Sequence, residues 1–177
     1  MSDQNGISKA NRPQLRLVER RMSLKDRNPE LALKILQMRL TIAPILHVQT
    51  GKPAPDYPYS MLDLFLLTED QLDALAYYYS QVTPSELTHQ YPQTMNWDQP
   101  FLDKDPALPE NCRLNDLERL KIKMRMFARF IGMRGAATPI WEYERQIEIL
   151  GNKIERSVQE EEAMAKKYYW GPTAKPP

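Results

Sequence analysis

The chain has 177 residues, of which 42% are hydrophobic, and a formal net charge of +1, so it is long enough for one domain with its own core. It has no apolar run of about 18 residues, which excludes a membrane-spanning helix. The polar N-terminus lacks the apolar segment of a signal peptide, and the single Cys112 has no partner for an internal disulfide, so we expect a cytoplasmic protein.

The near-zero net charge hides a segregated pattern. Residues 1–40 contain nine Lys or Arg and four Asp or Glu, whereas residues 53–110 contain ten Asp or Glu and only one basic residue, Lys104. This alternation favours pairing between segments, or between two copies of the chain, over a simple nucleic-acid-binding protein.

We predict three parts along the chain. Residues 1–27 form a basic, partly disordered arm, which either docks onto the acidic middle of the chain or reaches a partner. Residues 28–170 form a single helical domain, and residues 171–177 form a disordered tail. The first firm helix is predicted over 29–48, because Asn28 is a good N-cap and Pro29 suits the first helical position. Its two apolar rows indicate a largely buried helix, which Pro44 kinks or ends.

Two capping boxes mark the next helices. Ser60 with Asp63 predicts the start of a short helix, and Thr68 with Gln71 predicts a helix from 69 to about 80.

A long proline-rich loop follows. Thr83 and Pro84 predict one more short helix that ends near residue 89. Residues 91–112 then contain four prolines and no clear periodicity, which is typical of a loop. We expect Trp97 and Phe101 to hold this loop against the helices.

The chain is organised around two long helices joined by a glycine turn. Asn115 is the predicted N-cap of the first, Gly132 and Gly135 end it, and Thr138 followed by Pro139 begins the second. Residues 113–134 contain seven basic and two acidic residues, and residues 142–162 contain seven acidic and three basic ones. The short connection predicts a long antiparallel helical hairpin, and the fold class is an all-α bundle packed around it by the 29–48 and 69–81 helices.

An apolar seam at 3-4 spacing runs along both predicted helices, as it does where helices pair. The residues we assign to interaction on this seam are Phe127, Ile131, Ile140, Tyr143, Ile147, Leu150 and Ile154. The second helix outruns the first, so its far half needs another partner or faces water. The leading hypothesis is therefore a non-enzymatic interaction protein that self-associates as a homodimer; a further protein partner is possible.

The alternative is a cofactor-independent enzyme of cyclase or isomerase type, acting on a hydrophobic small molecule. In it His89 is a general base oriented by Asp98, and tyrosine hydroxyls act as donors. The candidate catalytic residues are His89, Asp98, Tyr78 and Tyr91. The candidate pocket residues are Tyr59, Tyr78, Tyr79, Trp97 and Phe101.

A third hypothesis is nucleic-acid binding. Residues 131–135 (IGMRG) resemble the GXXG loop of K-homology domains, a family that implies binding of a nucleic-acid backbone. The match covers about ten residues, Pro139 stands where the family's second helix is already running, and no strand pattern follows. A glycine-capped hairpin explains the turn better, so nucleic acid is an unlikely partner. The residues that would contact it are Arg125, Arg129 and Arg134.

Metal and cofactor sites are not expected. The chain has two histidines and one cysteine without the spacing of a zinc site, and it has no glycine-rich nucleotide-binding pattern.

Residues 67–76 (LTEDQLDALA), the pairs Thr83-Pro84 and Tyr91-Pro92, and residues 127–135 (FARFIGMRG) together resemble small uncharacterised helical proteins of filamentous fungi. The resemblance covers residues 60–165. It implies a fungal source and an intracellular setting, and it implies no activity.

Overall fold

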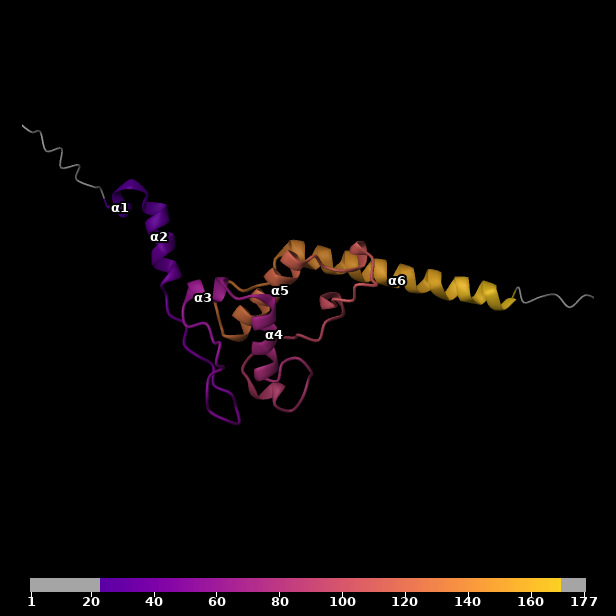
Figure 1. Ribbon diagram of the computed structural model, residues 1–177, viewed down its shortest axis with the longest axis horizontal. Helices are drawn as coiled ribbons and strands as arrows, with labels where there is room; N and C mark the ends of the chain where they lie inside the picture. The colour runs from indigo at the N-terminus through magenta and orange to yellow at the C-terminus, as the bar shows by residue number, and fades with distance from the viewer. Residues whose placement is uncertain (1–22, 170–177) are drawn as a thin grey trace, which may run out of the picture. The chain divides into compact units, whose positions relative to one another are not determined.

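The structure is a computed structural model that describes residues 23–169, and every regular element in this range is a helix. The helices are α1 (Leu24–Arg27), α2 (Pro29–Met38), α3 (Met61–Phe65), α4 (Glu69–Tyr78), α5 (Asp116–Phe130) and α6 (Ile140–Tyr169), with three short 3-10 helices, η1 (Thr88–Gln90), η2 (Pro100–Leu102) and η3 (Glu110–Cys112) (Figure 1). The all-α fold class is confirmed.

The chain divides into two compact units between Gln37 and Met38. This division falls inside the predicted helical domain rather than at its start. The predicted disorder of residues 1–22 and of the tail 171–177 lies outside the described residues.

The first unit contains α1 and all of α2 except its last residue, Met38. The side chain of Asn28 accepts a hydrogen bond from the Leu31 backbone N–H at 2.9 Å, and α2 begins at Pro29, as predicted. Two other predictions for this helix are wrong. It ends at Met38 rather than near residue 48, and none of its residues is buried.

The second unit begins with an extended segment where the helix was expected to continue. The Leu40 carbonyl accepts from the Met61 N–H, and the Ile42 N–H donates to the Tyr59 carbonyl, both at 2.9 Å. The Tyr79 hydroxyl also donates to the Ile45 carbonyl at 2.7 Å. The backbone groups of this segment are therefore satisfied by the rest of the unit, which replaces the hydrogen bonds that a helix would have made.

The capping boxes are confirmed. Reciprocal side-chain and backbone bonds open α3 at Ser60 and α4 at Thr68, as predicted, and the predicted N-cap Asn115 forms a third such box at the start of α5. The short helix predicted from Thr83 is wrong, because only the three residues of η1 are helical there. The Thr88 hydroxyl donates to the Ser80 carbonyl at 2.6 Å, which closes this region into a compact turn instead.

The core lies between α4, α5 and the loop that precedes α5. Tyr79 from the end of α4 and Phe127 and Phe130 from α5 are fully buried. Trp97 and Phe101 are also buried, so they hold the proline-rich loop against the helices as predicted. The loop is thus part of the core rather than a cover over it.

A part-buried ionic network joins α4 to α5. Glu69 accepts from Arg119 Nε at 2.7 Å and from Lys123 Nζ at 2.8 Å, and Lys123 also donates to Asp73 at 2.6 Å. Trp97 Nε1 donates to the same Asp73 carboxylate at 2.8 Å. Residues 69 and 73 are four apart on one helix, and residues 119 and 123 are four apart on the other. The two helices therefore pack through matched rows of opposite charge.

The burial of these cations requires carboxylate partners. Arg119 is 6% exposed and Lys123 is 4% exposed, and an unpaired charge at that depth would cost several kcal/mol. Burial alone would raise the pKa of Glu69, but hydrogen bonds from Arg119, Lys123 and Lys104 lower that pKa from 4.5 to about 2.

Gly132 and Gly135 form the turn between α5 and α6. Their φ angles are +77° and +83°, in the left-handed region that glycine enters without a steric penalty, so the predicted glycine turn is confirmed. The predicted seam is only half packed within the chain: its α5 residue Phe127 is buried in the core, whereas its α6 residues are exposed. α6 lies instead against η2, η3 and their loop, and the contacts recorded between α5 and α6 include the ion pairs Arg125–Glu142 and Glu118–Arg145. The long antiparallel hairpin is not confirmed by these contacts.

Candidate interaction surface

The face of α6 that contacts the rest of the unit is polar. Four of its side chains donate hydrogen bonds to backbone carbonyls of the proline-rich loop. The pairs are Arg145 to Arg113 at 3.2 Å, Asn152 to Asn111 at 2.8 Å, Lys153 to Pro100 and Arg156 to Ala107 at 3.5 Å. Lys153 also forms an ion pair with Asp103 at 2.8 Å. This face supplies the hydrogen bonds that an irregular loop cannot make for itself.

Among the described side chains of α6, only Glu142 and Ile149 are buried. Arg125 of α5 donates from Nε, at 2.6 Å, and from Nη2 to the two carboxylate oxygens of Glu142. Gln146 donates to one of these oxygens at 3.1 Å. A bidentate pair of this kind fixes orientation as well as position, so it sets the rotation of α6 about its own axis.

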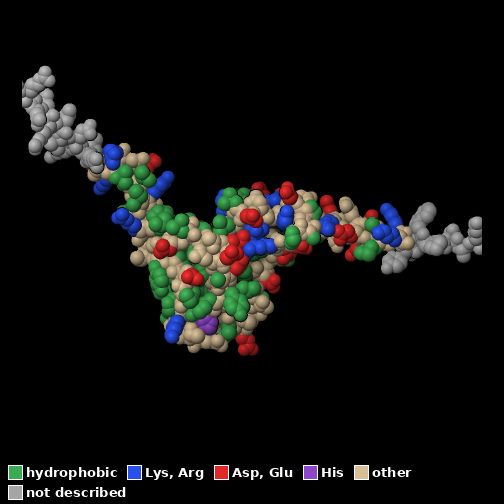
Figure 2. Space-filling view, in the orientation of Figure 1, with side chains coloured by type: hydrophobic (Ala, Val, Ile, Leu, Met, Phe, Trp, Pro, Cys, Tyr) green, Lys and Arg blue, Asp and Glu red, His purple; other side chains and the backbone are tan. Residues whose placement is uncertain are grey.

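The apolar row of α6 faces outward. At about 100° per residue it is turned roughly 140° from Glu142 and Ile149. We call it the outer stripe: Ile140 (76% exposed), Tyr143 (55%), Ile147 (72%), Leu150 (36%), Ile154 (65%) and Val158 (49%). Figure 2 shows hydrophobic side chains on the surface where α6 begins, and charged ones towards its far end. A helix that supports a globular unit normally buries its apolar row, and here that relation is reversed.

The C-terminal part of α6 has no cover. Every described side chain from residue 157 to residue 167 is exposed, and Figure 1 shows this part of the helix running past the rest of the second unit. The prediction that the helix outruns its neighbours thus matches the structure.

The predicted interaction residues fall into two groups. Phe127 is fully buried in the core of its own chain, and Ile131 is partly buried against it, so neither presents a free surface. The five predicted residues of α6 all lie on the outer stripe. What the sequence reading missed is the polar inner face, although its signal is present: residues 142, 145, 149, 152 and 156 also recur at 3-4 spacing.

The structure brings Tyr78 and Tyr91 each against one ring, that of Tyr79, but shows no interaction that joins them to His89 or Asp98. His89 and Asp98 are exposed, and neither side chain makes a hydrogen bond or ion pair recorded with another described residue. The Tyr78 hydroxyl donates to the Lys52 carbonyl at 3.1 Å, and the buried Tyr91 hydroxyl accepts from the Val48 N–H at 3.2 Å. Both hydroxyls thus have structural partners.

The candidate pocket residues are also dispersed. Tyr79 and Trp97 belong to the core, whereas Tyr59 is 51% exposed. Tyr78 lines a cavity of about 360 Å³, and Phe101 lines a different one of about 150 Å³ beside the start of α6. The aromatic side chains therefore do not enclose one common cavity.

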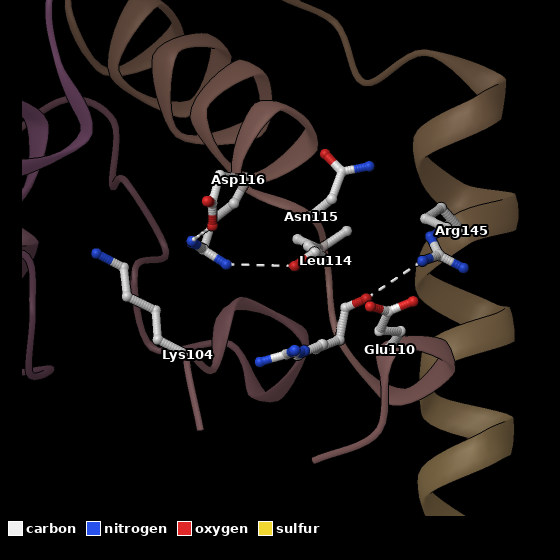
Figure 3. Close-up of a pocket in the computed structure, with 8 residues that line it drawn as sticks. Lys104, Glu110, Leu114, Asn115, Asp116 and Arg145 are labelled. Atoms are coloured by element: carbon white, nitrogen blue, oxygen red, sulfur yellow. Dashed lines mark hydrogen bonds and ion pairs between the residues drawn. The ribbon is translucent and has the colours of Figure 1, made fainter. Parts of the chain in front are cut away.

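A further cavity, of about 500 Å³, lies at the N-terminus of α5, and Figure 3 shows its lining residues. Three of its cations already have carboxylate partners. The pairs are Lys104 with Glu69 at 3.0 Å, Arg119 with Asp116 at 2.6 Å and Arg145 with Glu148 at 2.8 Å. The fourth cation, Arg113, has no ion pair recorded in the described range, but Glu110 and Asp116 also line the cavity, so carboxylates offset most of its positive charge.

The three candidate nucleic-acid-binding arginines have different surroundings. Arg125 is committed to Glu142, whereas Arg129 and Arg134 are exposed. Two exposed cations do not form a continuous basic path along a nucleic-acid backbone.

Comparison with known protein families, with curated proteins and with solved structures gave no match. Over residues 23–169, no cluster of three or more His, Cys, Asp or Glu side chains has the arrangement of a metal site. In the same range, none of the helices combines the length and apolarity needed to cross a bilayer.

Proposed function

We propose that the protein is a non-enzymatic interaction protein that self-associates through the outer stripe of α6. The observation that carries this proposal is the reversed orientation of α6, whose polar face contacts its own chain while its apolar row faces outward. A second copy of the chain is a partner that would cover this row.

The size of the stripe supports a stable contact. α6 has 30 residues, so it spans about 45 Å at roughly 1.5 Å per residue. Burying one Leu or Ile side chain contributes about 1.5–3 kcal/mol, so the six side chains of the stripe, which are 36% to 76% exposed, supply roughly 7 kcal/mol per copy. With two copies contributing, this gain is of the same order as the 4–15 kcal/mol that association costs in lost freedom of motion.

The setting we propose is cytoplasmic. Cys112, the last residue of η3, is a buried free cysteine, and a reducing compartment keeps such a thiol unmodified.

Sedimentation velocity of the full chain tests the proposal. We expect a dimer or larger species at about 10 µM, and we expect the double variant Ile147→Glu/Ile154→Glu to sediment as a monomer, because it places two carboxylates within the apolar row. The matched control is Gln159→Glu/Ala163→Glu, which introduces the same two negative charges at exposed positions of α6 away from the stripe and should leave the oligomer intact. A strict monomer in the unmodified chain at this concentration would refute the proposal.

A further inference from the structure

A second apolar surface lies between α3 and α5 and could receive α6. It is a groove of about 300 Å³, and its apolar lining comes from α3, α5 and the glycine turn. The apolar residues are Leu64, Phe65, Met124, Ala128, Met133 and Ala136. Phe65 is 52% exposed, and the neighbouring Leu62 and Leu66 are 48% and 68% exposed. The groove is therefore bordered by apolar surface that its own chain leaves open.

The rim of this groove is basic. Lys121 and Arg134 line it, and both side chains are exposed. Neither forms an ion pair with another residue in the described range, unlike Arg125, which also lines the groove but is bound to Glu142. Two cations at the rim are thus free to meet a carboxylate from outside.

The outer stripe of α6 has an acidic border. Glu144, Glu155 and Glu162 lie along one side of it, within about 40–60° of Ile140 at 100° per residue. All three are exposed, and none is paired with a described residue, whereas Glu148 and Glu160 bind Arg145 and Arg156 of their own helix. The stripe and the groove are therefore complementary in both polarity and charge.

We propose that α6 of one copy docks in the α3–α5 groove of a second copy, with Glu144 and Glu155 facing Lys121 and Arg134. This inference rests on the proposed self-association and specifies which surfaces meet. A chain's own α6 is not the occupant, because burial of Glu142 and Ile149 on the inner face turns the stripe outward. The exchange is reciprocal: each copy gives a helix and receives one, which closes a two-fold dimer.

Direct pairing of two α6 stripes is the competing arrangement, and it fits the charges less well. When two identical helices pair in antiparallel orientation, each flanking row of one helix lies next to the equivalent row of the other. The row that contains Glu144, Glu155 and Glu162 would therefore face the same three glutamates of the second copy. Like charges at these positions oppose association.

A charge-swap experiment on the full chain tests the inference. The groove variant is Lys121→Glu/Arg134→Glu, and the helix variant is Glu144→Lys/Glu155→Lys. All four side chains are exposed, so folding should persist, which far-ultraviolet circular dichroism checks. We expect each variant alone to self-associate at least about tenfold more weakly than the unmodified chain, since like charges then face each other. An equimolar mixture should recover association to within about threefold, because both contacts in the mixed dimer regain opposite charges.

The matched control for the groove variant is Lys52→Glu/Arg129→Glu, which makes the same change in net charge at two exposed cations outside the groove. Sedimentation velocity gives the dissociation constants, and native mass spectrometry identifies the mixed dimer. If the groove variant associates as strongly as the unmodified chain, the inference is overturned while self-association through the stripe stands. The inference also fails if both variants weaken but the mixture does not recover. A monomeric unmodified chain overturns both proposals together.

Discussion

The ionisation of Glu69 makes the stability of the second unit fall at acidic pH. Its pKa is lowered from 4.5 to about 2, even though burial acts in the opposite direction, by hydrogen bonds from Arg119, Lys123 and Lys104. Because the folded state binds this proton less readily than the unfolded state, the stabilisation is complete above about pH 4.5 and is lost as the pH falls towards 2. At 1.36 kcal/mol per pKa unit the limit is about 3 kcal/mol, and solvent screening of the partly exposed carboxylate reduces it to about 1–2 kcal/mol.

The substitution Glu69→Gln isolates this contribution. We expect it to lower the free energy of unfolding near neutral pH by about 2–3 kcal/mol, because Arg119 and Lys123 lose a carboxylate but retain Asp116 and Asp73 as partners. Urea unfolding at pH 6, 4.5, 3.5 and 2.5 measures this difference.

The difference in unfolding free energy between the unmodified protein and Glu69→Gln should become smaller by about 1–2 kcal/mol as the pH falls from 4.5 to 2.5. The other carboxylates titrate equally in both proteins and therefore do not change this difference. Glu86→Gln is the control, because it removes an exposed carboxylate that is paired with no described residue. A gap that stays constant over this pH range would show that the network does not hold Glu69 ionised.

Three further predictions concern the anchors of the fold. Glu142→Gln should destabilise the protein by about 3 kcal/mol in urea unfolding, because it leaves Arg125 part-buried without its bidentate partner. Burial raises the pKa of Tyr79 to about 12 and also raises the pKa of Tyr57 and Tyr91, so spectrophotometric titration should show fewer tyrosines ionising near pH 10 in the folded protein than in the unfolded chain, and this difference should be smaller by one tyrosine in Tyr79→Phe. Gly132→Ala should lower the free energy of unfolding by about 1 kcal/mol, because this residue has a positive φ. Gly151→Ala, inside α6 with open space around the added Cβ, should raise the free energy of unfolding by roughly 0.5–1 kcal/mol. Equal shifts of the two variants in thermal unfolding would contradict this contrast.

Features that depend on a few neighbouring residues could be predicted from the sequence. The caps at Ser60, Thr68 and Asn115 and the glycine turn at Gly132 are set by side chains that satisfy backbone groups within one helical turn. The apolar row of α6 was also identified from its spacing.

Features that depend on distant partners could not be predicted in this way. The segment after Met38 has a helical pattern, but its carbonyls are used by Met61 and by tyrosine hydroxyls far along the chain. In the same way, the spacing of the α6 row does not state which face the rest of the unit contacts. The face of α6 that contacts the rest of the unit is determined by Glu142, whose partner Arg125 lies on another helix. Periodicity identifies a face, and only the partners show what covers it.

Two free energies of similar size oppose each other in the orientation of α6. Turning the stripe inward would bury apolar surface worth roughly 7 kcal/mol. The same rotation would break the Arg125–Glu142 pair, at about 3–5 kcal/mol, and the hydrogen bonds to four loop carbonyls, at about 1 kcal/mol each. The two sums are comparable, so an isolated chain gains little by either choice. A second copy removes the conflict, because the polar face keeps its own loop while the stripe is covered by the partner. On this reasoning, weakening the Arg125–Glu142 pair should also weaken self-association, since α6 would then be free to rotate its stripe towards its own chain.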